Sequence, residues 1–254
     1  MTGLAQIRST FLDFFKKQGH EVVGLGITGP GIPNAPDIRY YRYKPIAPKP
    51  PSAVALARDH EAKLARGIAC AQAMERLKQE GFMPEVVVAH PGWGEALFCK
   101  DVWPQAKLVI FAEFYYGPDG SDFAFDPEFS TDSVAGRMRL RLKNTEQLQA
   151  LAAADWAYSP THWQHSRLPA EFQAKTAVLF DGIDTQAARP DPQAHVTLQR
   201  AAVTLRAGDE VLTFVNRNLE PYRGFHTFMR ALPAILKARP RAHCLIVGRD
   251  SVSY

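Results

Sequence analysis

Residues 210–248 constrain the fold of this chain more than any other stretch of its sequence. Val211 to Val215 and Cys244 to Val247 are short, apolar, β-prone runs of the kind that form buried strands. Between them, six apolar residues recur at helical spacing on one face of a predicted helix: Phe225, Phe228, Met229, Leu232, Ile235 and Leu236. A strand, a helix and a strand in this order predict one βαβ unit, and therefore an α/β fold.

The turn between the first strand and the helix, residues 216–224, carries Arg217 and Arg223, and Gly224 stands where the helix begins. Ligands of open α/β folds bind outside the carboxyl ends of the strands, and a helix start offers free N–H groups and a positive dipole end. Two guanidinium groups beside such a start predict an oxyanion site, which we interpret as a diphosphate site. The alternative is an exposed arginine pair in an ordinary βα turn.

The run NRNLEPYRGFHTFMRALPAIL resembles the opening of the nucleotide-sugar-binding domain in retaining glycosyltransferases of the two-domain GT-B architecture. Among these enzymes, it is similar to those of glycosyltransferase family 4. In that family an arginine and a Lys-Gly pair bind the pyrophosphate of the donor. Arg217 matches the arginine. Arg223 and Gly224 match the Lys-Gly pair with arginine in place of lysine, a change that keeps the positive charge.

Three more motifs resemble the same family in the same order: HPGWGE from His90, SPTHWQ from Ser159 and DGIDT from Asp181. The first follows a buried-type strand over Glu85 to Ala89, and loops at strand ends often carry chemistry. The resemblance implies that His90 faces the cleft between two domains and touches the sugar or the acceptor. The alternative is a histidine that caps this loop beside a structural tryptophan.

A second candidate residue follows the next predicted strand, Leu108 to Ala112. Glu113 stands at the end of that strand, where its carboxylate is expected to orient the acceptor. The alternative is a carboxylate that is merely solvated.

The resemblance implies an α/β, GT-B-like fold with two Rossmann-like parallel-sheet domains. Residues 1–190 are expected to form the acceptor-side domain, and residues 191–254 the first part of the nucleotide-sugar-binding domain. Members of the family continue with glutamates that bind the donor sugar and ribose, so we expect the second domain to be incomplete and this chain alone to be inactive.

The first residues of the chain resemble a different family. Residues 2–23 are similar to the start of alanyl-tRNA synthetases, where IR-x-x-FLDFF-x-x-x-GH recurs, and none of the ATP or tRNA motifs of a synthetase follow. Coincidence, a fusion and an aberrant gene start remain open. Ala5 to Lys17 is predicted to be an amphipathic helix that Gly19 ends.

Hydrophobic periodicity predicts the remaining elements. Helices are expected from Ala53 to Glu80 and from Ser133 to Ala154, and further strands over Glu21 to Leu25, Asp37 to Tyr43, Asp155 to Ser159 and Ala177 to Phe180.

Composition excludes several classes of protein. No run reaches the ~20 apolar residues of a membrane span, and no secretory signal is present, so a cytoplasmic location is expected. The net charge of +4 is local, because residues 217–254 hold seven Lys/Arg against two acidic residues. A local excess argues against nucleic acid as a partner and suits a phosphate-bearing ligand.

The three cysteines lie far apart in apolar contexts and are interpreted as reduced core thiols.

These observations predict a glycosyltransferase of the hexosyltransferase type that moves a sugar from a nucleotide diphosphate sugar to a saccharide or lipid-linked acceptor with retention. A lipid-linked acceptor would bring it to the inner face of the membrane as a peripheral protein. No cofactor and no metal are implied, since Arg217 and Arg223 would offset the leaving-group charge. The alternatives are a non-catalytic remnant or binding module with the same fold and, on residues 2–23 alone, a synthetase-related protein.

Overall fold

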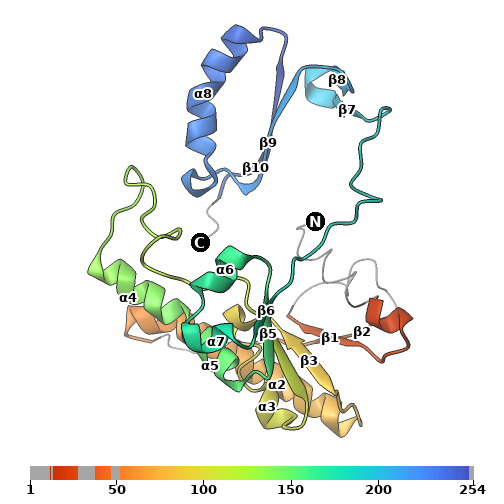
Figure 1. The fold of residues 1–254 in the computed structure, drawn as a ribbon, viewed down its shortest axis with the longest axis vertical. Coiled ribbons are helices and arrows are strands. Elements are labelled where there is room, and N and C mark those ends of the chain that lie inside the picture. Colours follow the sequence, from red (N-terminus) through yellow and green to blue (C-terminus); the bar gives the residue numbers. More distant parts are fainter. Residues whose placement is uncertain (1–11, 13, 28–37, 47–51, 252–254) are drawn as a thin grey trace. The chain divides into compact units, whose positions relative to one another are not determined.

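The computed structural model describes residues 12, 14–27, 38–46 and 52–251. The chain divides into two compact units (Figure 1). Unit 1 comprises Met1–Phe125 and Asp132–Gly182, and unit 2 comprises Asp126–Thr131 and Ile183–Tyr254.

Unit 1 is built on a parallel sheet with the strand order β3-β4-β5-β6. Its strands are β3 (Val86–Ala89), β4 (Lys107–Phe111), β5 (Trp156–Ser159) and β6 (Thr176–Val178). A second parallel pair joins β1 (Val23–Gly26) to β2 (Arg39–Arg42). Helices lie between successive strands of the four-stranded sheet, because parallel neighbours need a crossover connection. The prediction of an α/β fold with parallel sheets is confirmed.

The helices of unit 1 bury the apolar residues that the sequence places at helical spacing. They are η1 (Ala55–Ala57), α2 (Arg58–Gln79), η2 (Pro91–Trp93), α3 (Cys99–Val102), α4 (Val134–Lys143), α5 (Thr145–Ala153), α6 (His162–Arg167) and α7 (Ala170–Gln173). Met74 and Leu77 of α2 meet Leu108 and Ile110 of β4 and Leu151 of α5 in one core, where each side chain is almost fully buried. This core fixes α2 and α5 against the sheet.

The expectation of one helix from Ser133 to Ala154 is wrong at Asn144, where α4 ends and α5 begins. The Asn144 side chain accepts a hydrogen bond from the backbone N–H of Tyr116 (3.0 Å) and donates one to the Tyr116 carbonyl (2.8 Å). Asn144 is buried. Its bonds to a loop outside the helix account for a break that periodicity does not signal.

Unit 2 contains the predicted βαβ unit. Strands β9 (Val211–Asn218) and β10 (His243–Arg249) are parallel, and α8 (Phe225–Ala238) connects them after the short η4 turn (Pro221–Arg223). The ring of Phe214 in β9 packs on Phe225 and Phe228 of α8, with centroids 5.4 and 4.8 Å apart. The βαβ prediction is confirmed.

An antiparallel hairpin precedes this βαβ unit, and the sequence analysis did not anticipate it. Its strands are β7 (His195–Leu198) and β8 (Val203–Arg206), joined by η3 (Gln199–Ala201). Ala202 closes the turn in the left-handed region at φ 51°, which is uncommon for a residue with a side chain. A turn built on alanine carries no glycine signal, so the hairpin is hard to recognise from sequence.

The segment Asp126–Thr131 belongs to unit 2, although unit 1 residues flank it in the sequence. Glu128 accepts two hydrogen bonds from the Arg230 guanidinium of α8, one of them 2.8 Å long. Asp126 Oδ2 lies 3.2 Å from His226 Nε2, and the Phe129 ring packs on the His226 ring. These contacts hold the segment along the first turns of α8.

The predicted N-terminal helix and the synthetase-like stretch 2–23 lie mostly outside the described residues. Residues 14–17 are helical, and Gly19 follows them at φ +88°. No helix in the described ranges is long and apolar enough to cross a membrane.

Two of the three cysteines are core residues, as expected. Cys70 and Cys99 are buried, and burial raises the pKa of each thiol to about 12. Both therefore stay protonated at neutral pH, the unreactive form of the side chain.

Candidate functional site

The structure brings His90 and Glu113 together at one edge of the unit 1 sheet. Strands β3 and β4 are parallel neighbours with Ala89 paired to Ile110, so their carboxyl ends meet at the same edge. His90 directly follows β3, and Glu113 lies two residues beyond β4. His90 Nε2 and Glu113 Oε2 are 3.1 Å apart.

The hydrogen bonds of His90 define its tautomer. Its Nδ1 accepts a hydrogen bond from the Gly92 backbone N–H (3.1 Å) at the start of η2. A neutral imidazole that accepts at Nδ1 carries its proton on Nε2, which then donates to the Glu113 carboxylate. His90 therefore caps the loop, as the alternative interpretation held, and also contacts the second candidate residue.

The loop that carries His90 is packed closely on α2. Gly94 adopts φ +99°, and a Cβ at this position would lie 2.1 Å from the Lys63 carbonyl oxygen. A Cβ on Gly67 of α2 would lie 2.7 Å from the Gly94 carbonyl oxygen. Two glycines allow this close approach of backbones, which a side chain at either position would prevent.

Glu113 is held through its backbone as well as its side chain. The Gln164 side chain donates a 2.7 Å hydrogen bond to the Glu113 carbonyl oxygen. Gln164 lies in α6, whose first turn is capped by Thr161 Oγ1, an acceptor for the Gln164 N–H (3.2 Å). The SPTHWQ motif thus builds a short capped helix that fixes the end of β4. Sequence reasoning noticed the motif and missed this role of Gln164.

A second acidic residue belongs to this edge of unit 1. Burial, and next the negative charge of Glu113, raise the pKa of the Asp181 carboxyl, the first residue of DGIDT. The sequence analysis treated DGIDT only as a family signature. A carboxylate directly after the last predicted strand was the signal that could have identified it.

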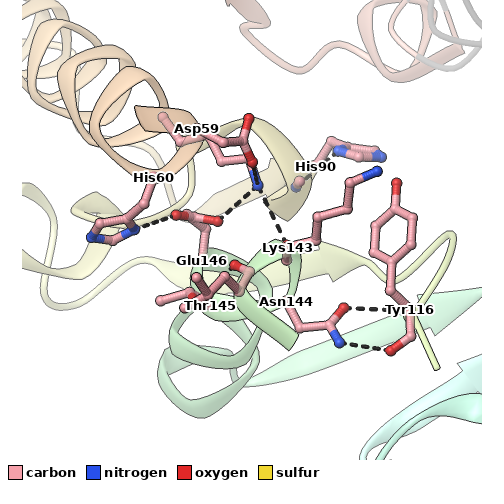
Figure 2. A network of polar contacts seen from close by, with 11 residues as sticks. Asp59, His60, His90, Tyr116, Lys143, Asn144, Thr145 and Glu146 are labelled. Carbon is pink, nitrogen blue, oxygen red and sulfur yellow. Dashed lines mark hydrogen bonds and ion pairs between the residues drawn. The ribbon is translucent and has the colours of Figure 1, made fainter. Parts of the chain in front are cut away.

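A buried ionic cluster lies beside the place where the His90 loop packs on α2 (Figure 2). Glu146 is 1% exposed, and its carboxylate lies 3.0 Å from Lys63 Nζ and 2.6 Å from His60 Nδ1. Lys63 also contacts Asp59 at 3.0 Å. A buried carboxylate needs such partners because it has lost its hydration. The cluster fastens α5 to the first turns of α2.

Tyr116 is fixed beside this cluster. Its backbone N–H and carbonyl groups are both hydrogen-bonded to the Asn144 side chain, and the Lys143 ammonium lies 4.8 Å from the centre of the Tyr116 ring. Burial lowers the pKa of Lys143. Figure 2 shows the side-chain ends of Lys143, Tyr116 and His90 in the same part of the view, to the right of the Glu146 carboxylate.

The other predicted residues lie in unit 2, at the β9–α8 turn. Gly224 is the N-cap residue of α8 at φ 75°, in agreement with its predicted place at the helix start. Arg223 ends the η4 turn, with Nε 3.5 Å from a carboxylate oxygen of the buried Glu220 and its guanidinium over the Tyr222 ring. Arg217 lies on β9, and strand alternation places it on the face opposite Phe214.

Within the described ranges, the chain has no group of three or more His, Cys, Asp or Glu side chains that could hold a metal ion. His165, one of a histidine pair in α6, has its Nε2 3.1 Å from the Gln173 carbonyl oxygen.

Comparison with solved structures finds similarity to a protein described as a UDP-N-acetylglucosamine 2-epimerase from Listeria monocytogenes. The TM-score is 0.41 at 15% identity, and the match covers 77% of this chain and 46% of that chain. This chain thus spans less than half the length of that structure.

Comparison of the sequence with curated proteins gives no match. The model of the glycosyl transferase family 4 group matches residues 18–188, which are well over half of the chain. The matched residues include the whole edge that carries His90, Glu113, Gln164 and Asp181. The chain therefore belongs to the glycosyl transferase family 4 group.

Proposed function

We propose that this glycosyltransferase-family protein moves a sugar from a nucleotide diphosphate sugar to a saccharide or lipid-linked acceptor, with retention of configuration at the transferred sugar. The observation that carries the proposal is the His90–Glu113 pair at the carboxyl edge of the family-matched sheet. Open α/β proteins bind ligands at this edge.

The pair has the chemistry to position an acceptor. The Glu113 carboxylate accepts hydrogen bonds only, and His90 already donates to its Oε2. An acceptor hydroxyl that donates to the same carboxylate would be oriented with its oxygen lone pairs toward the donor sugar. That oxygen forms the new glycosidic bond on the face that the diphosphate leaves, as the bond from the sugar to the diphosphate breaks and the hydroxyl proton passes to the Glu113 carboxylate.

The unit 2 residues would bind the diphosphate. The first turn of α8 begins at a glycine, so its N–H groups have no side-chain cap there. Arg217, near the carboxyl end of β9, and Arg223, at the end of the η4 turn, would add positive charge, and the charge that develops on the leaving diphosphate is offset by such groups. Arg223 would exchange its contact with Glu220, now 3.5 Å long, for shorter contacts with phosphate oxygens.

Calorimetric titration of UDP, GDP and ADP tests this assignment. Arg217→Ala and Arg223→Ala should each weaken binding of the preferred diphosphate roughly tenfold to a hundredfold, the value of one charge-assisted contact. Arg223→Lys should lose less than Arg217→Lys, because a lysine normally stands at the former position in the resembling family. Binding should also weaken with added salt.

Arg239→Ala provides the matched control. Arg239 is an exposed arginine of unit 2 that pairs with Glu210 at the far end of α8, and its loss should leave binding unchanged. Equal affinities for the wild type and Arg217→Ala would remove the diphosphate assignment.

A further inference from the structure

We propose that Trp163, with Phe114 and Tyr116 behind it, forms a stacking subsite for a neutral pyranose ring of the acceptor. This inference rests on the proposed function, since it names how the acceptor saccharide is held beside His90 and Glu113.

The first observation is an exposed tryptophan on an ordered aromatic base. Trp163 is 49% exposed although tryptophan is usually well buried. Its ring centroid lies 6.1 Å from that of Phe114, and Phe114 meets Tyr116 edge-on at 5.2 Å. Phe114 and Tyr116 are themselves half-buried. The three rings form a continuous apolar surface that ends at the exposed indole.

The second observation is the rigid connection between this surface and the polar pair. Trp163 is the second residue of α6, and its neighbour Gln164 is bonded to the Glu113 carbonyl oxygen. Phe114 follows Glu113 directly in the chain. The aromatic residues are therefore tied to the backbone at Glu113, and hydrogen bonds of the capped helix α6 set that placement.

The chemistry of the surroundings favours a sugar. A pyranose presents C–H groups on its faces and hydroxyls at its rim, so it needs a flat apolar surface bordered by hydrogen-bonding groups. Aromatic side chains offer a large apolar surface at low entropic cost. Glu113 and His90 are the hydrogen-bonding groups that the subsite would use at the rim of the sugar. Lys143 lies over the Tyr116 ring, and Trp163 is the exposed residue among the three aromatic ones.

Trp156 makes an internal comparison. It opens β5 at the amino end of the strand and is 61% exposed, whereas Trp163 follows the carboxyl end of the same strand. The two indoles have similar exposure at opposite edges of one sheet. Only the carboxyl edge is the ligand-binding edge of such sheets, so Trp163 should respond to saccharide and Trp156 should not.

The experiment follows the indole N–H signals of the ¹⁵N-labelled full chain by NMR. The probes are short neutral oligosaccharides built from glucose, galactose, mannose or N-acetylglucosamine, titrated one at a time. We expect at least one to shift the Trp163 signal in a saturable manner while the signals of Trp156 and the buried Trp103 stay in place. The absence of any Trp163 shift across the series, or equal shifts at Trp156, would overturn the inference.

Three substitutions sharpen the result. Trp163→Ala should weaken binding of the responding oligosaccharide about tenfold or more, and Trp163→Phe should recover part of that loss because a ring remains. Trp156→Ala should leave the affinity unchanged. Trp163 is exposed, so these variants are expected to fold, and circular dichroism checks that they do. A Trp163 signal that responds to UMP and to no oligosaccharide would assign the ring to a nucleobase and overturn the sugar subsite.

Different experimental results would reject the stacking subsite at Trp163 and the proposed transferase function. Saccharide binding at Trp163 without nucleoside diphosphate binding would keep the subsite and remove the transferase proposal. Normal diphosphate binding with a silent Trp163 would do the reverse.

Discussion

His90 Nε2 lies 3.1 Å from Glu113 Oε2, although 23 positions separate the two residues in the sequence. The pairing arises because His90 follows β3, Glu113 follows β4, and the two strands are parallel neighbours. The same histidine accepts a backbone hydrogen bond at Nδ1. The imidazole is thereby fixed at both nitrogens before any ligand arrives.

The first prediction concerns the tautomer of His90. We expect ¹⁵N NMR of the neutral imidazole to show the proton on Nε2, because Nδ1 accepts from Gly92. Glu113→Gln should keep this proton protected from exchange, since an amide oxygen can still accept its hydrogen bond. Glu113→Ala should make it exchange faster. A predominant Nδ1–H form would contradict the geometry of the pair.

The second prediction concerns Gly94, the residue that seats the His90 loop on α2. Gly94→Ala adds the strain of a left-handed backbone and a Cβ 2.1 Å from the Lys63 carbonyl oxygen, so we expect a loss of roughly 3 kcal/mol or more in unfolding free energy. Gly81→Ala is the control. Gly81 has a similar φ of +91° with open space around its Cβ position, and its loss should be about 1–2 kcal/mol. Urea denaturation measures both, and equal losses would show that the loop relaxes away from α2.

The third prediction concerns the buried ion pair of Lys63 and Glu146. Glu146→Ala leaves the Lys63 charge poorly compensated in the interior and should lower the unfolding free energy by about 3 kcal/mol. The double variant Lys63→Met, Glu146→Leu should lose less than the sum of its two single substitutions, because no unpaired charge remains. Asp59→Ala, at an exposed partner of Lys63, should change stability by only about 0.5 kcal/mol. Additive losses in the double variant would argue against the pairing.

The fourth prediction is a pH dependence that originates at Asp155. The hydrogen bond from Lys100, and next the bond from the Leu108 N–H, hold the pKa of Asp155 below its usual range. A lowered folded-state pKa stabilises the fold at pH values above the unfolded pKa of about 4, and this contribution is lost as the pH falls through the folded-state pKa. Asp155→Asn should therefore lower stability at neutral pH by about 1 kcal/mol after solvent screening, and the difference from wild type should shrink in acid.

Asp132→Asn is the comparison for that experiment. Its pKa is also lowered, by Arg137, but both side chains are exposed. Its effect on unfolding at neutral pH should therefore be smaller than that of Asp155→Asn. Thermal unfolding curves across the pH range measure both variants, and a difference at Asp155 that persists unchanged in strong acid would refute the linkage.

The sequence determined the elements whose signal is local. Period-2 and period-3.6 patterns located β9, α8, β10 and the four strands of the main sheet of unit 1 to within a few residues, because side-chain burial imposes those periods directly. Gly19 and Gly224 were correctly placed at helix boundaries, since their left-handed backbone excludes most other residues. His90 and Glu113 were recognised as candidates from their positions after two strands.

Only the tertiary structure decided which of these residues meet. The break at Asn144, the bond from Gln164 to Glu113 and the placement of Trp163 all depend on partners dozens of positions away or on a neighbouring element. His90 likewise accepts a hydrogen bond from the Gly92 N–H in its own loop and donates one to the Glu113 carboxylate, which follows the neighbouring strand. Periodicity reports whether a residue is buried or exposed, whereas the identity of its neighbour is set by strand order and packing, which no single stretch of sequence encodes.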